Sequence, residues 1–571
     1  MRILAAALLS LLATEPPVLA QKAAPIAPVQ GLVAARNGMV VAEEARAARI
    51  GVDILKRGGN AVDAAVAVGF ALAVTLPYAG NLGGGGFMLV RLAHENKMTA
   101  IDYRETAPAG TKADTFLDVR GEADPKKSRE EGVAIGVPGT VAGLAFAHRQ
   151  YGSGKFTLAE LIAPAIELAR GGIVVDVELA DAFAKAKPLL ARWPSTAAIF
   201  LHPDGSPFGE GELLVQRDLA STLEEIARQG PEAFYAGRIA EQIARSVQAA
   251  GGVMTREDIA RYQALERAPV AGNYRGYDIF SMPPPSSGGV HLLQILNILE
   301  GYDLSVLGAA SIQGTHLMVE AMKLAYADRA RFLGDPQFVQ VPVAGLLSSS
   351  YAAELRKHIE PEHALRADEL PGGNPAAYEG DHTTHYSIVD GDGNAVANTY
   401  TLNLRFGAGL VAEGTGILLN NELDDFAAKP GAPNAFGLVG GLANAPGPGK
   451  KPLSSMAPTI VLKNGKLFLV TGSPGGSRII STVVNVLVNV IDYKMNIAEA
   501  TAAPRVHHQW LPDEVRVESG FKADVVSVLQ SRGNRVVTGV PWGSAASIMV
   551  TKDGLLGAAD PRSRGALAAG F

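Results

Sequence analysis

The chain of 571 residues contains no cysteine. This absence excludes disulfide bonds, thiolate nucleophiles, zinc–thiolate sites and a lipid-modified N-terminal cysteine. Any covalent catalysis by the protein itself must therefore use a serine, threonine, lysine or carboxylate side chain.

Basic clusters and membrane-length apolar segments are also missing. The 51 basic and 57 acidic residues give a formal net charge of −6. No run of lysine and arginine suggests a phosphate-binding surface, which argues against nucleic acid as a partner. The longest internal apolar stretch, residues 64–79, is shorter than the roughly 20 residues that span a bilayer. We expect it to form a buried core helix.

The N-terminus has the pattern of an export signal. Arg2 is followed by residues 3–13, an apolar stretch interrupted only by Ser10, and the small-residue context of residues 18–20 precedes Gln21. This order is typical of a secretory signal peptide. We therefore expect residues 1–20 to be removed, so that the mature exported chain begins at Gln21 without a membrane anchor.

Amphipathic helices and β-hairpins with polar turns alternate along the chain. Helices are predicted at residues 42–57, 157–170 and 311–332, the second opened by a capping-box pattern of Thr157 and Glu160. The predicted hairpins pair residues 87–91 with 98–104, 386–390 with 395–401, 459–462 with 467–470, and 548–550 with 555–556. Linkers rich in glycine and proline are predicted at residues 369–380 and 429–451. The mixture favours an α+β protein with antiparallel sheets inside and helices outside.

The familiar hydrolase and nucleotide-binding motifs are absent. No serine has glycine at both −2 and +2, which excludes the nucleophile elbow. The glycines at 83–86 are followed by Phe87 and Met88 instead of Lys-Ser/Thr, so we expect close backbone packing and not a phosphate loop. The histidines that lack metalloprotease spacing are expected to be surface or structural residues; they are His358, His363, His507 and His508.

Thr383 offers a different kind of nucleophile. The linker at 369–380 runs almost directly into the first strand of a hairpin, so cleavage before Thr383 would give this residue both a hydroxyl and an α-amine. An α-amine, with a pKa of about 7.7–8, acts as a general base near neutral pH. With the turn centred on residues 392–393, Thr383 lies opposite Leu402 in a two-residue loop or opposite Thr401 in a three-residue loop.

Several motifs follow one another in an order that resembles the γ-glutamyltransferases. In chain order they are Gly83–Met88, Arg104–Pro108, Thr383–Asp390, Asn398–Asn403, Gly416–Asn421, Pro452–Met456 and Gly472–Arg478. The resemblance extends from about residue 35 to the C-terminus. It implies an N-terminal nucleophile hydrolase with a four-layer αββα sandwich, a single globular unit made as a proenzyme that cleaves itself.

Self-cleavage between His382 and Thr383 is implied by the same resemblance. The large subunit would comprise residues 21–382 and the small subunit residues 383–571, and the two would stay together as a heterodimer with one interlaced core. The motifs are most similar to those of Gram-negative bacterial members. The resemblance therefore favours the periplasm, with secretion into the medium as the second choice.

The resemblance also implies catalytic roles. Thr383 would be the nucleophile, and Thr401 would hydrogen-bond its oxygen. Gly475 and Gly476 would form the oxyanion hole, where backbone N–H groups approach the tetrahedral oxygen. No metal or organic cofactor is implied.

A substrate-binding role is implied for a second set of residues, because a γ-glutamyl group ends in an α-amino acid. Its carboxylate needs hydrogen-bond donors and its ammonium needs acceptors. The implied donors are Arg104, Ser454 and Ser455, and the implied acceptors are Asn403, Glu422 and Asp425.

The implied reaction is a two-step acyl transfer. Thr383 attacks the γ-amide of glutathione or a related γ-glutamyl compound, and water, an amino acid or a peptide then takes the acyl group from the ester. The alternative is a related acylase for glutaryl amides, which would leave Glu422 and Asp425 without an ammonium partner. A third hypothesis is an exported protein that binds amino-acid-like ligands without chemistry.

Two departures from the family pattern lie near the implied site. Phe436 stands in the segment that resembles the lid loop, residues 430–441, where some bacterial members have tyrosine. A phenylalanine can cover the pocket, but it cannot donate a hydrogen bond toward Asn403. Leu404 and Arg405 replace smaller polar residues of some relatives. Both departures bear on the balance between hydrolysis and transfer and on the preferred acceptor.

Overall fold

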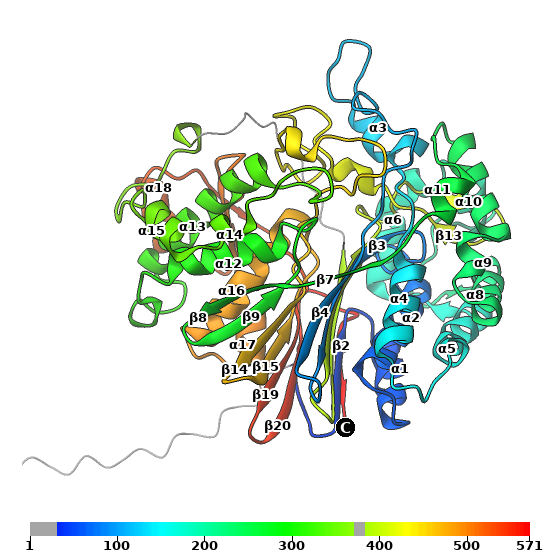
Figure 1. Ribbon diagram of the computed structural model, residues 1–571, viewed down its shortest axis with the longest axis horizontal. Coiled ribbons are helices and arrows are strands. Elements are labelled where there is room, and N and C mark those ends of the chain that lie inside the picture. Colours follow the sequence, from blue (N-terminus) through cyan, green and yellow to red (C-terminus); the bar gives the residue numbers. More distant parts are fainter. Residues whose placement is uncertain (1–30, 371–382) are drawn as a thin grey trace, which may run out of the picture.

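The computed structural model describes residues 31–370 and 383–571 (Figure 1). The predicted signal peptide, residues 1–20, lies outside the described residues. So do His382, at the predicted cleavage junction, and most of the predicted linker at 369–380.

The centre of the molecule consists of two antiparallel sheets of seven strands each. The first sheet has the strand order β21 (Leu567–Gly570), β2 (Gly38–Ala42), β10 (Thr384–Asp390), β11 (Ala395–Thr401), β3 (Gly85–Leu92), β4 (Lys97–Tyr103) and β7 (Leu265–Arg267). The second has the order β1 (Leu32–Ala35), β20 (Gly554–Ala559), β19 (Ala546–Thr551), β15 (Lys466–Thr471), β14 (Thr459–Lys463), β9 (Tyr277–Ser281) and β8 (Val270–Tyr274). The predicted hairpins are all confirmed.

Helices cover the outer face of each sheet (Figure 1). On the side of the first sheet lie α1 (Ala45–Lys56), α2 (Ala61–Thr75), α4 (Thr140–Tyr151), α5 (Leu158–Gly171), α6 (Val177–Leu190), α7 (Pro194–Phe200), α8 (Arg217–Gln229), α9 (Glu232–Tyr235), α10 (Arg238–Ala249) and α11 (Arg256–Ala260). On the side of the second lie α12 (Gly288–Leu299), α13 (Ile312–Phe332), α14 (Val343–Leu346), α15 (Ser349–Arg356), α16 (Ile479–Ile491), α17 (Ile497–Ala502) and α18 (Ala523–Ser531). The predicted αββα sandwich is confirmed.

Short elements complete the structure. They are α3 (Pro125–Arg129), the pair β5 (Ile173–Val174) and β6 (Leu213–Leu214), the pair β12 (Val411–Ala412) and β13 (Ile417–Leu418), and the three strands β16 (Val506–His507), β17 (Val515–Glu518) and β18 (Val536–Gly539).

Both sheets contain strands from before and from after residue 383. In the first sheet, β10 and β11 lie between β2 and β3. In the second, β14 pairs with β9 and β20 pairs with β1. Each sheet therefore needs both parts of the chain, which explains why two fragments cut at this residue would hold together.

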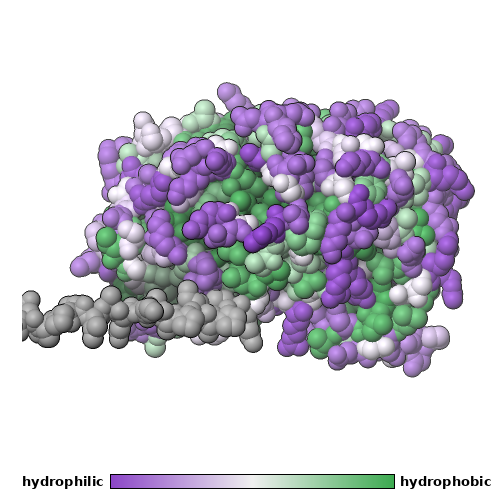
Figure 2. All heavy atoms as spheres, turned by 90° about the horizontal axis from the view of Figure 1, so that it is seen from below, coloured by the Kyte–Doolittle hydropathy of each residue, from purple (hydrophilic) through white to green (hydrophobic). Residues whose placement is uncertain are grey.

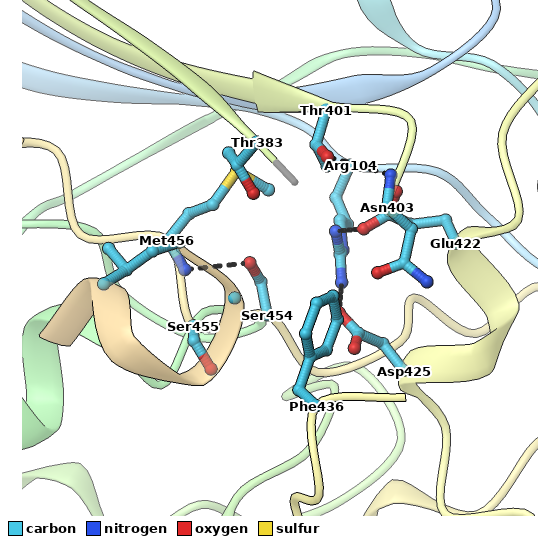
Figure 3. A pocket seen from close by; sticks show the side chains of 12 residues that line it. Arg104, Thr383, Thr401, Asn403, Glu422, Asp425, Phe436, Ser454, Ser455 and Met456 are labelled. Carbon is cyan, nitrogen blue, oxygen red and sulfur yellow. Dashed lines mark hydrogen bonds and ion pairs between the residues drawn. The ribbon is translucent and has the colours of Figure 1, made fainter. Parts of the chain in front are cut away.

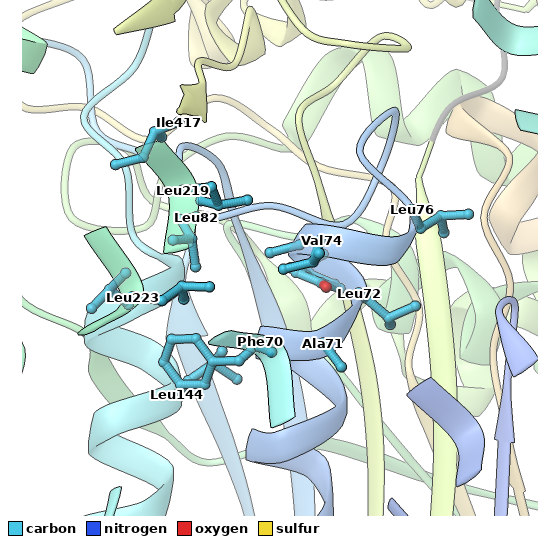
Figure 4. Packing of buried hydrophobic residues seen from close by; sticks show 14 of the residues in the cluster. Phe70, Ala71, Leu72, Val74, Leu76, Leu82, Leu144, Leu219, Leu223 and Ile417 are labelled. Atoms are coloured by element: carbon cyan, nitrogen blue, oxygen red, sulfur yellow. The ribbon is translucent and has the colours of Figure 1, made fainter. Parts of the chain in front are cut away.

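Helix α2 is the buried core helix that the apolar stretch predicts. Its residues are all buried, and Phe70, Leu72 and Val74 belong to a hydrophobic cluster that also contains Leu144 and Leu223 (Figure 4). The helix ends at Thr75, so the last four residues of the predicted stretch leave it. Within residues 31–370 and 383–571, no helix is long and apolar enough to cross a membrane.

Two loop lengths were predicted for the β10–β11 hairpin, and the structure has the three-residue loop. Asp390 N–H donates to the Asn394 carbonyl (3.1 Å), and Gly393 has a φ of 80°. The Asp390 carboxylate accepts hydrogen bonds from the backbone N–H groups of Asp392 (3.0 Å) and Asn394 (2.9 Å), which holds the loop in this form. Because Thr384 pairs with Tyr400, the register places Thr383 opposite Thr401. The alternative with Leu402 is wrong.

The glycines at 83–86 allow strands to approach closely, as the sequence predicts. A Cβ on Gly84 would lie 2.0 Å from the Thr401 carbonyl oxygen, and one on Gly86 would lie 2.5 Å from that of Thr399. Glycine at these positions lets the start of β3 lie against β11.

Replacing Gly84 by alanine should therefore displace Thr401. We expect Gly84→Ala to lower the free energy of unfolding by about 1–3 kcal/mol, the usual cost of overpacking, as measured by urea denaturation. The matched control is Gly171→Ala, because a Cβ there meets no atom within 4 Å. Equal stability of the two variants would contradict this interpretation.

Candidate active site

Thr383 and Thr401 lie side by side at the ends of two neighbouring strands. Thr383 directly precedes β10 and is 7% exposed, and Thr401 is the last residue of β11. The Thr401 hydroxyl accepts a hydrogen bond from the Asn403 N–H (2.8 Å). Asn403 has a φ of 74°, which turns the chain away from the strand. The hairpin therefore places a second hydroxyl beside the predicted nucleophile.

One pocket brings together nearly all of the predicted site residues (Figure 3). We call it the Arg104 pocket; it is lined by Arg104, Thr383, Thr401, Asn403, Glu422, Asp425, Phe436, Ser454, Ser455, Met456, Gly476 and Ile479. Gly475 does not line the Arg104 pocket but borders a neighbouring one, which Thr383 also lines.

Arg104 is paired with the carboxylates that the sequence assigns to a ligand ammonium. Arg104 directly follows β4, and its side chain is fully buried. The guanidinium donates hydrogen bonds to Glu422 and to Asp425 Oδ2 (2.5 Å). Its Nε donates to the Pro452 carbonyl (3.1 Å). A buried guanidinium needs such partners because an unpaired buried charge is very costly. The donor and acceptors for an α-amino acid are thus present, but in this structure they neutralise one another.

Glu105 is a buried carboxyl group beside Arg104, outside the set of pocket-lining residues, and no role was predicted for it. Its side chain is fully buried, and neither oxygen has a hydrogen-bond partner among the described residues. The nearest cation is Arg104 Nη1, at 4.0 Å. Burial raises the Glu105 pKa to about 7, and burial also raises the pKa of both Glu422 and Asp425. The sequence signal that could have indicated Glu105 is its place next to Arg104 in the motif Arg104–Pro108.

Arg329 is a second cation that sequence reasoning missed. It lies on α13, is 4% exposed, and donates to the hydroxyls of Ser455 (3.2 Å) and Ser287 (2.9 Å). Burial lowers its pKa to about 10, so it stays charged at neutral pH. Ser454 is fixed nearby, because its hydroxyl accepts from the Met456 N–H at 3.0 Å. The serine side of the pocket is therefore more positive than the sequence indicates.

The glycine pair lies at the start of a helix. Gly475 and Gly476 have φ values of 137° and 52°, which other residues rarely adopt. They lead through a 3₁₀ turn, Gly476–Arg478, into α16. The first N–H groups of a helix have no intrahelical partner and carry partial positive charge, which suits an oxyanion.

Phe436 closes the Arg104 pocket. Its ring lies against Gly476, where an added Cβ would be 2.3 Å from the ring, and it is 8% exposed. The remaining cavity has a volume of about 10 Å³, roughly the room of one water molecule. The lid role of Phe436 stays a prediction; the structure places its ring in the wall of the Arg104 pocket.

The histidines occupy the two settings that the sequence predicts. His358 and His363 are exposed. His507 and His508 are buried, and His507 Nδ1 forms a hydrogen bond with the Ser481 hydroxyl at 2.8 Å. Within the described ranges, no group of three or more His, Asp and Glu residues is arranged to hold a metal ion.

Comparisons with known proteins point to one family. The family described as gamma-glutamyltranspeptidase matches residues 47–570. A glutathione hydrolase proenzyme of Escherichia coli is 55% identical over 541 residues, covering 94% of this chain and 93% of the relative. One from a Pseudomonas species is 47% identical over 554 residues, covering 95% and 96%. The crystal structure of a cephalosporin acylase from Bacillus halodurans superposes with a TM-score of 0.83 at 29% identity, covering 97% of this chain and 99% of that one.

The two facing sheets between helical layers, with a hydroxyl residue at the start of an inner strand, define an N-terminal nucleophile hydrolase. The match over residues 47–570 then narrows the class. The chain belongs to the gamma-glutamyltranspeptidase family.

The raised pKa of Glu105 predicts a pH dependence of stability. A carboxyl group with a pKa near 4.5 when unfolded and about 7 when folded binds its proton more tightly in the folded state, so its contribution is lost as pH rises through 7. Relative to Glu105→Gln, the wild type should lose on the order of 3 kcal/mol of unfolding free energy between pH 4.5 and 8. Urea denaturation at several pH values measures this difference, and a difference independent of pH would contradict it.

Proposed function

We propose that this protein cleaves the γ-glutamyl amide of glutathione and related compounds and passes the γ-glutamyl group to water, an amino acid or a peptide. The observation that carries the proposal is the position of Thr383 at a pocket that holds one guanidinium, two carboxyl groups and two serine hydroxyls. These groups complement the carboxylate and the ammonium of an α-amino acid. The 55% identity to a glutathione hydrolase proenzyme supports the same substrate class.

The first chemical step forms an ester on Thr383. Its oxygen attacks the γ-carbonyl carbon, and the α-amine of the same residue takes the hydroxyl proton and delivers it to the departing nitrogen. The N–H groups of Gly475 and Gly476 stabilise the tetrahedral oxygen. Thr401 holds the nucleophile's oxygen in place. Water or an amine then attacks the ester carbonyl carbon, and the bond from this carbon to the Thr383 oxygen breaks. The α-amine takes a proton from the attacking water or amine and delivers it to the Thr383 oxygen.

Ligand charges replace the internal ion pairs of the Arg104 pocket. The substrate carboxylate binds Arg104 and the hydroxyls of Ser454 and Ser455, while the ammonium binds Glu422 and Asp425. This exchange keeps every buried charge paired, because each internal ion pair is replaced by a pair with the ligand. Asn403 accepts from the ammonium through its side-chain oxygen; its amide nitrogen already donates to the Asn421 carbonyl (3.0 Å).

The active enzyme arises by self-cleavage between His382 and Thr383. The Thr383 oxygen attacks the His382 carbonyl, the peptide C–N bond breaks to give an ester with a free α-amine, and water opens the ester. The products are a large subunit of residues 21–382 and a small subunit of residues 383–571, which form a heterodimer. This maturation is supported by the proenzyme names of the relatives and by the two sheets, each of which contains strands from both parts of the chain.

Export to the periplasm completes the proposal. It is supported by Arg2, the apolar residues 3–13 and the small-residue context before Gln21. Secretion into the medium is the second choice.

An acylase for glutaryl amides is the alternative function. The similarity to a cephalosporin acylase structure favours it. A glutaryl group, however, has no α-ammonium and would leave Asp425 and Glu422 paired only with Arg104. We therefore favour the γ-glutamyl donor.

Maturation is tested by denaturing electrophoresis of the purified protein. The wild type should run as two polypeptides, and Thr383→Ala should run as one uncut chain without amidase activity. Thr384→Ala, at the next residue of β10, is the control and should still be cut. A single band from active wild-type protein would exclude Thr383 as an N-terminal nucleophile.

Donor choice is tested with two chromogenic amides that differ only in the α-ammonium. The wild type should hydrolyse γ-glutamyl-p-nitroanilide with a kcat/KM about 100-fold above that of glutaryl-p-nitroanilide, because loss of a buried charge partner costs about 2–5 kcal/mol. Asp425→Asn should lower the ratio of the two kcat/KM values. Asp524→Asn, on the exposed side of α18, is the control and should leave this ratio unchanged. Faster turnover of the glutaryl amide by wild type would establish the acylase alternative.

A further inference from the structure

Arg329 carries a buried positive charge that has no counter-charge beside it. Its guanidinium donates to two neutral groups, the hydroxyls of Ser455 (3.2 Å) and Ser287 (2.9 Å). Among the residues that the structure describes, it forms no ion pair with a carboxylate. Hydrophilic residues cover much of the face of the molecule seen in Figure 2, where water solvates their charges. Arg329 is shielded from that solvent, and an uncompensated buried charge is costly. An anion that binds close to Arg329 would therefore be stabilised.

The cation of the neighbouring pocket differs in this respect. Arg104 is ion-paired with both Glu422 and Asp425. Burial is the main reason that the pKa of Arg329 falls to about 10; the Asp425 charge raises this pKa, and the Arg104 charge lowers it. The two guanidinium groups therefore act on each other, but only Arg104 has carboxylates as hydrogen-bond partners. An anion bound at the serines of the Arg104 pocket would offset the repulsion between the two cations.

Arg329 also determines how the Ser455 hydroxyl can be used. A guanidinium only donates hydrogen bonds, whereas a hydroxyl has one hydrogen to donate and two lone pairs that accept. The Ser455 oxygen accepts from Arg329, and within the described ranges no group accepts the Ser455 hydrogen. Ser455 lines the Arg104 pocket (Figure 3). Its hydroxyl is therefore held as a donor for an oxygen of a bound ligand.

Ser287 extends the effect of Arg329 to the other serine of the pocket. Its hydroxyl accepts from Arg329 and donates to the Ser454 carbonyl (2.7 Å), which also accepts from the Ser287 N–H (2.8 Å). The Ser454 hydroxyl accepts from the Met456 N–H (3.0 Å), so it too retains its hydrogen for a ligand. A Cβ on Gly288 would lie 2.2 Å from the Met456 carbonyl oxygen, so the start of α12 packs directly against this segment. Both serines are thus fixed as donors from the side of α12 and α13.

We propose that Arg329 is a positioning residue that makes the enzyme selective for acyl groups with an α-carboxylate. It holds the Ser455 hydroxyl as a donor, fixes Ser454 through Ser287, and supplies a second positive charge for the carboxylate that Arg104 binds. The inference rests on the proposed function. The α-carboxylate keeps its charge throughout the reaction, so Arg329 acts on binding of the substrate and not on the reacting atoms.

The test compares two anilides that differ only in the α-carboxylate, γ-glutamyl-p-nitroanilide and 4-aminobutyryl-p-nitroanilide. The second-order rate constant for release of p-nitroaniline is measured with enzyme in excess over substrate, so that slow turnover is quantified too. Arg329→Gln should lower this constant about tenfold for the γ-glutamyl compound, the effect of losing about 1.4 kcal/mol. For the 4-aminobutyryl compound the change should be about twofold or less. Damage to the fold would lower both constants and leave their ratio unchanged.

Three further variants separate charge, position and fold. Arg329→Lys keeps the positive charge and a donor, and it should lose only about threefold on the γ-glutamyl compound. Ser287→Ala removes the link to Ser454 but keeps the charge, so it should lower the ratio of the two constants about threefold. Arg331→Gln, at an exposed position of the same helix, is the matched control and should behave like the wild type. Self-cleavage into two polypeptides reports whether each variant has folded, and Ser287→Ala carries the test if Arg329→Gln does not fold.

A double variant tests whether Arg329 acts through Ser455. On γ-glutamyl-p-nitroanilide, the combination of Arg329→Gln with Ser455→Ala should lose much less activity than the product of the two single losses, because contacting residues are coupled. Losses that multiply would overturn the inference, as would an Arg329→Gln effect of equal size on the two anilides. Failure of the matured wild type to release p-nitroaniline from the γ-glutamyl compound would instead overturn the proposed function.

Discussion

The pairing of β10 with strands on both of its edges is the constraint on which the site depends. β10 is hydrogen-bonded to β2 and to β11, and the Asp390 carboxylate closes the connecting loop. This register brings Thr383 opposite Thr401, while Gly84 lets β3 approach from the far side of β11. A slip by one residue would turn every side chain of β10 to the opposite face. Strand pairing therefore positions the nucleophile before any substrate contact is made.

The second constraint is that the buried charges of the Arg104 pocket must be paired, both with each other in this structure and with the charges of a bound ligand. Arg104 is buried and ion-paired with both Glu422 and Asp425, and one Glu422 oxygen has no hydrogen-bond partner among the described residues. Glu105 lies close by, and Arg329 donates to the Ser455 hydroxyl. Such a cluster is complementary to a ligand that brings one charge of each sign, because both internal partners are then replaced together. A ligand with only a carboxylate would leave the acidic side uncompensated. The same reasoning explains why Phe436 can pack tightly over the pocket while the ion pairs remain internal.

Local sequence signals predict much of the fold but little of the site. The apolar run of α2, the Thr157 capping box and the polar hairpin turns depend on neighbouring residues, and these elements form as predicted. The order of strands in the sheets depends on pairings between distant segments, so it was not predicted; the family resemblance implied only the αββα layers. Arg329 reaches Ser455 across 126 positions of sequence, and on α13 nothing local distinguishes it from other arginines. The sequence left two registers open for the β10–β11 hairpin. The hydrogen bonds of the Asp390 carboxylate, which the sequence pattern does not show, hold the three-residue loop.

The central claim is that the acyl group passes through an ester on Thr383, and rapid-quench mass spectrometry of the matured enzyme during turnover of a γ-glutamyl amide tests it most directly. The account predicts a mass increase equal to one γ-glutamyl group on the polypeptide that begins at Thr383, located to its N-terminal peptide after digestion. The adduct should disappear when the amide is exhausted. An adduct on any other residue, or turnover without an adduct in the burst phase under conditions where deacylation limits the rate, would contradict the account.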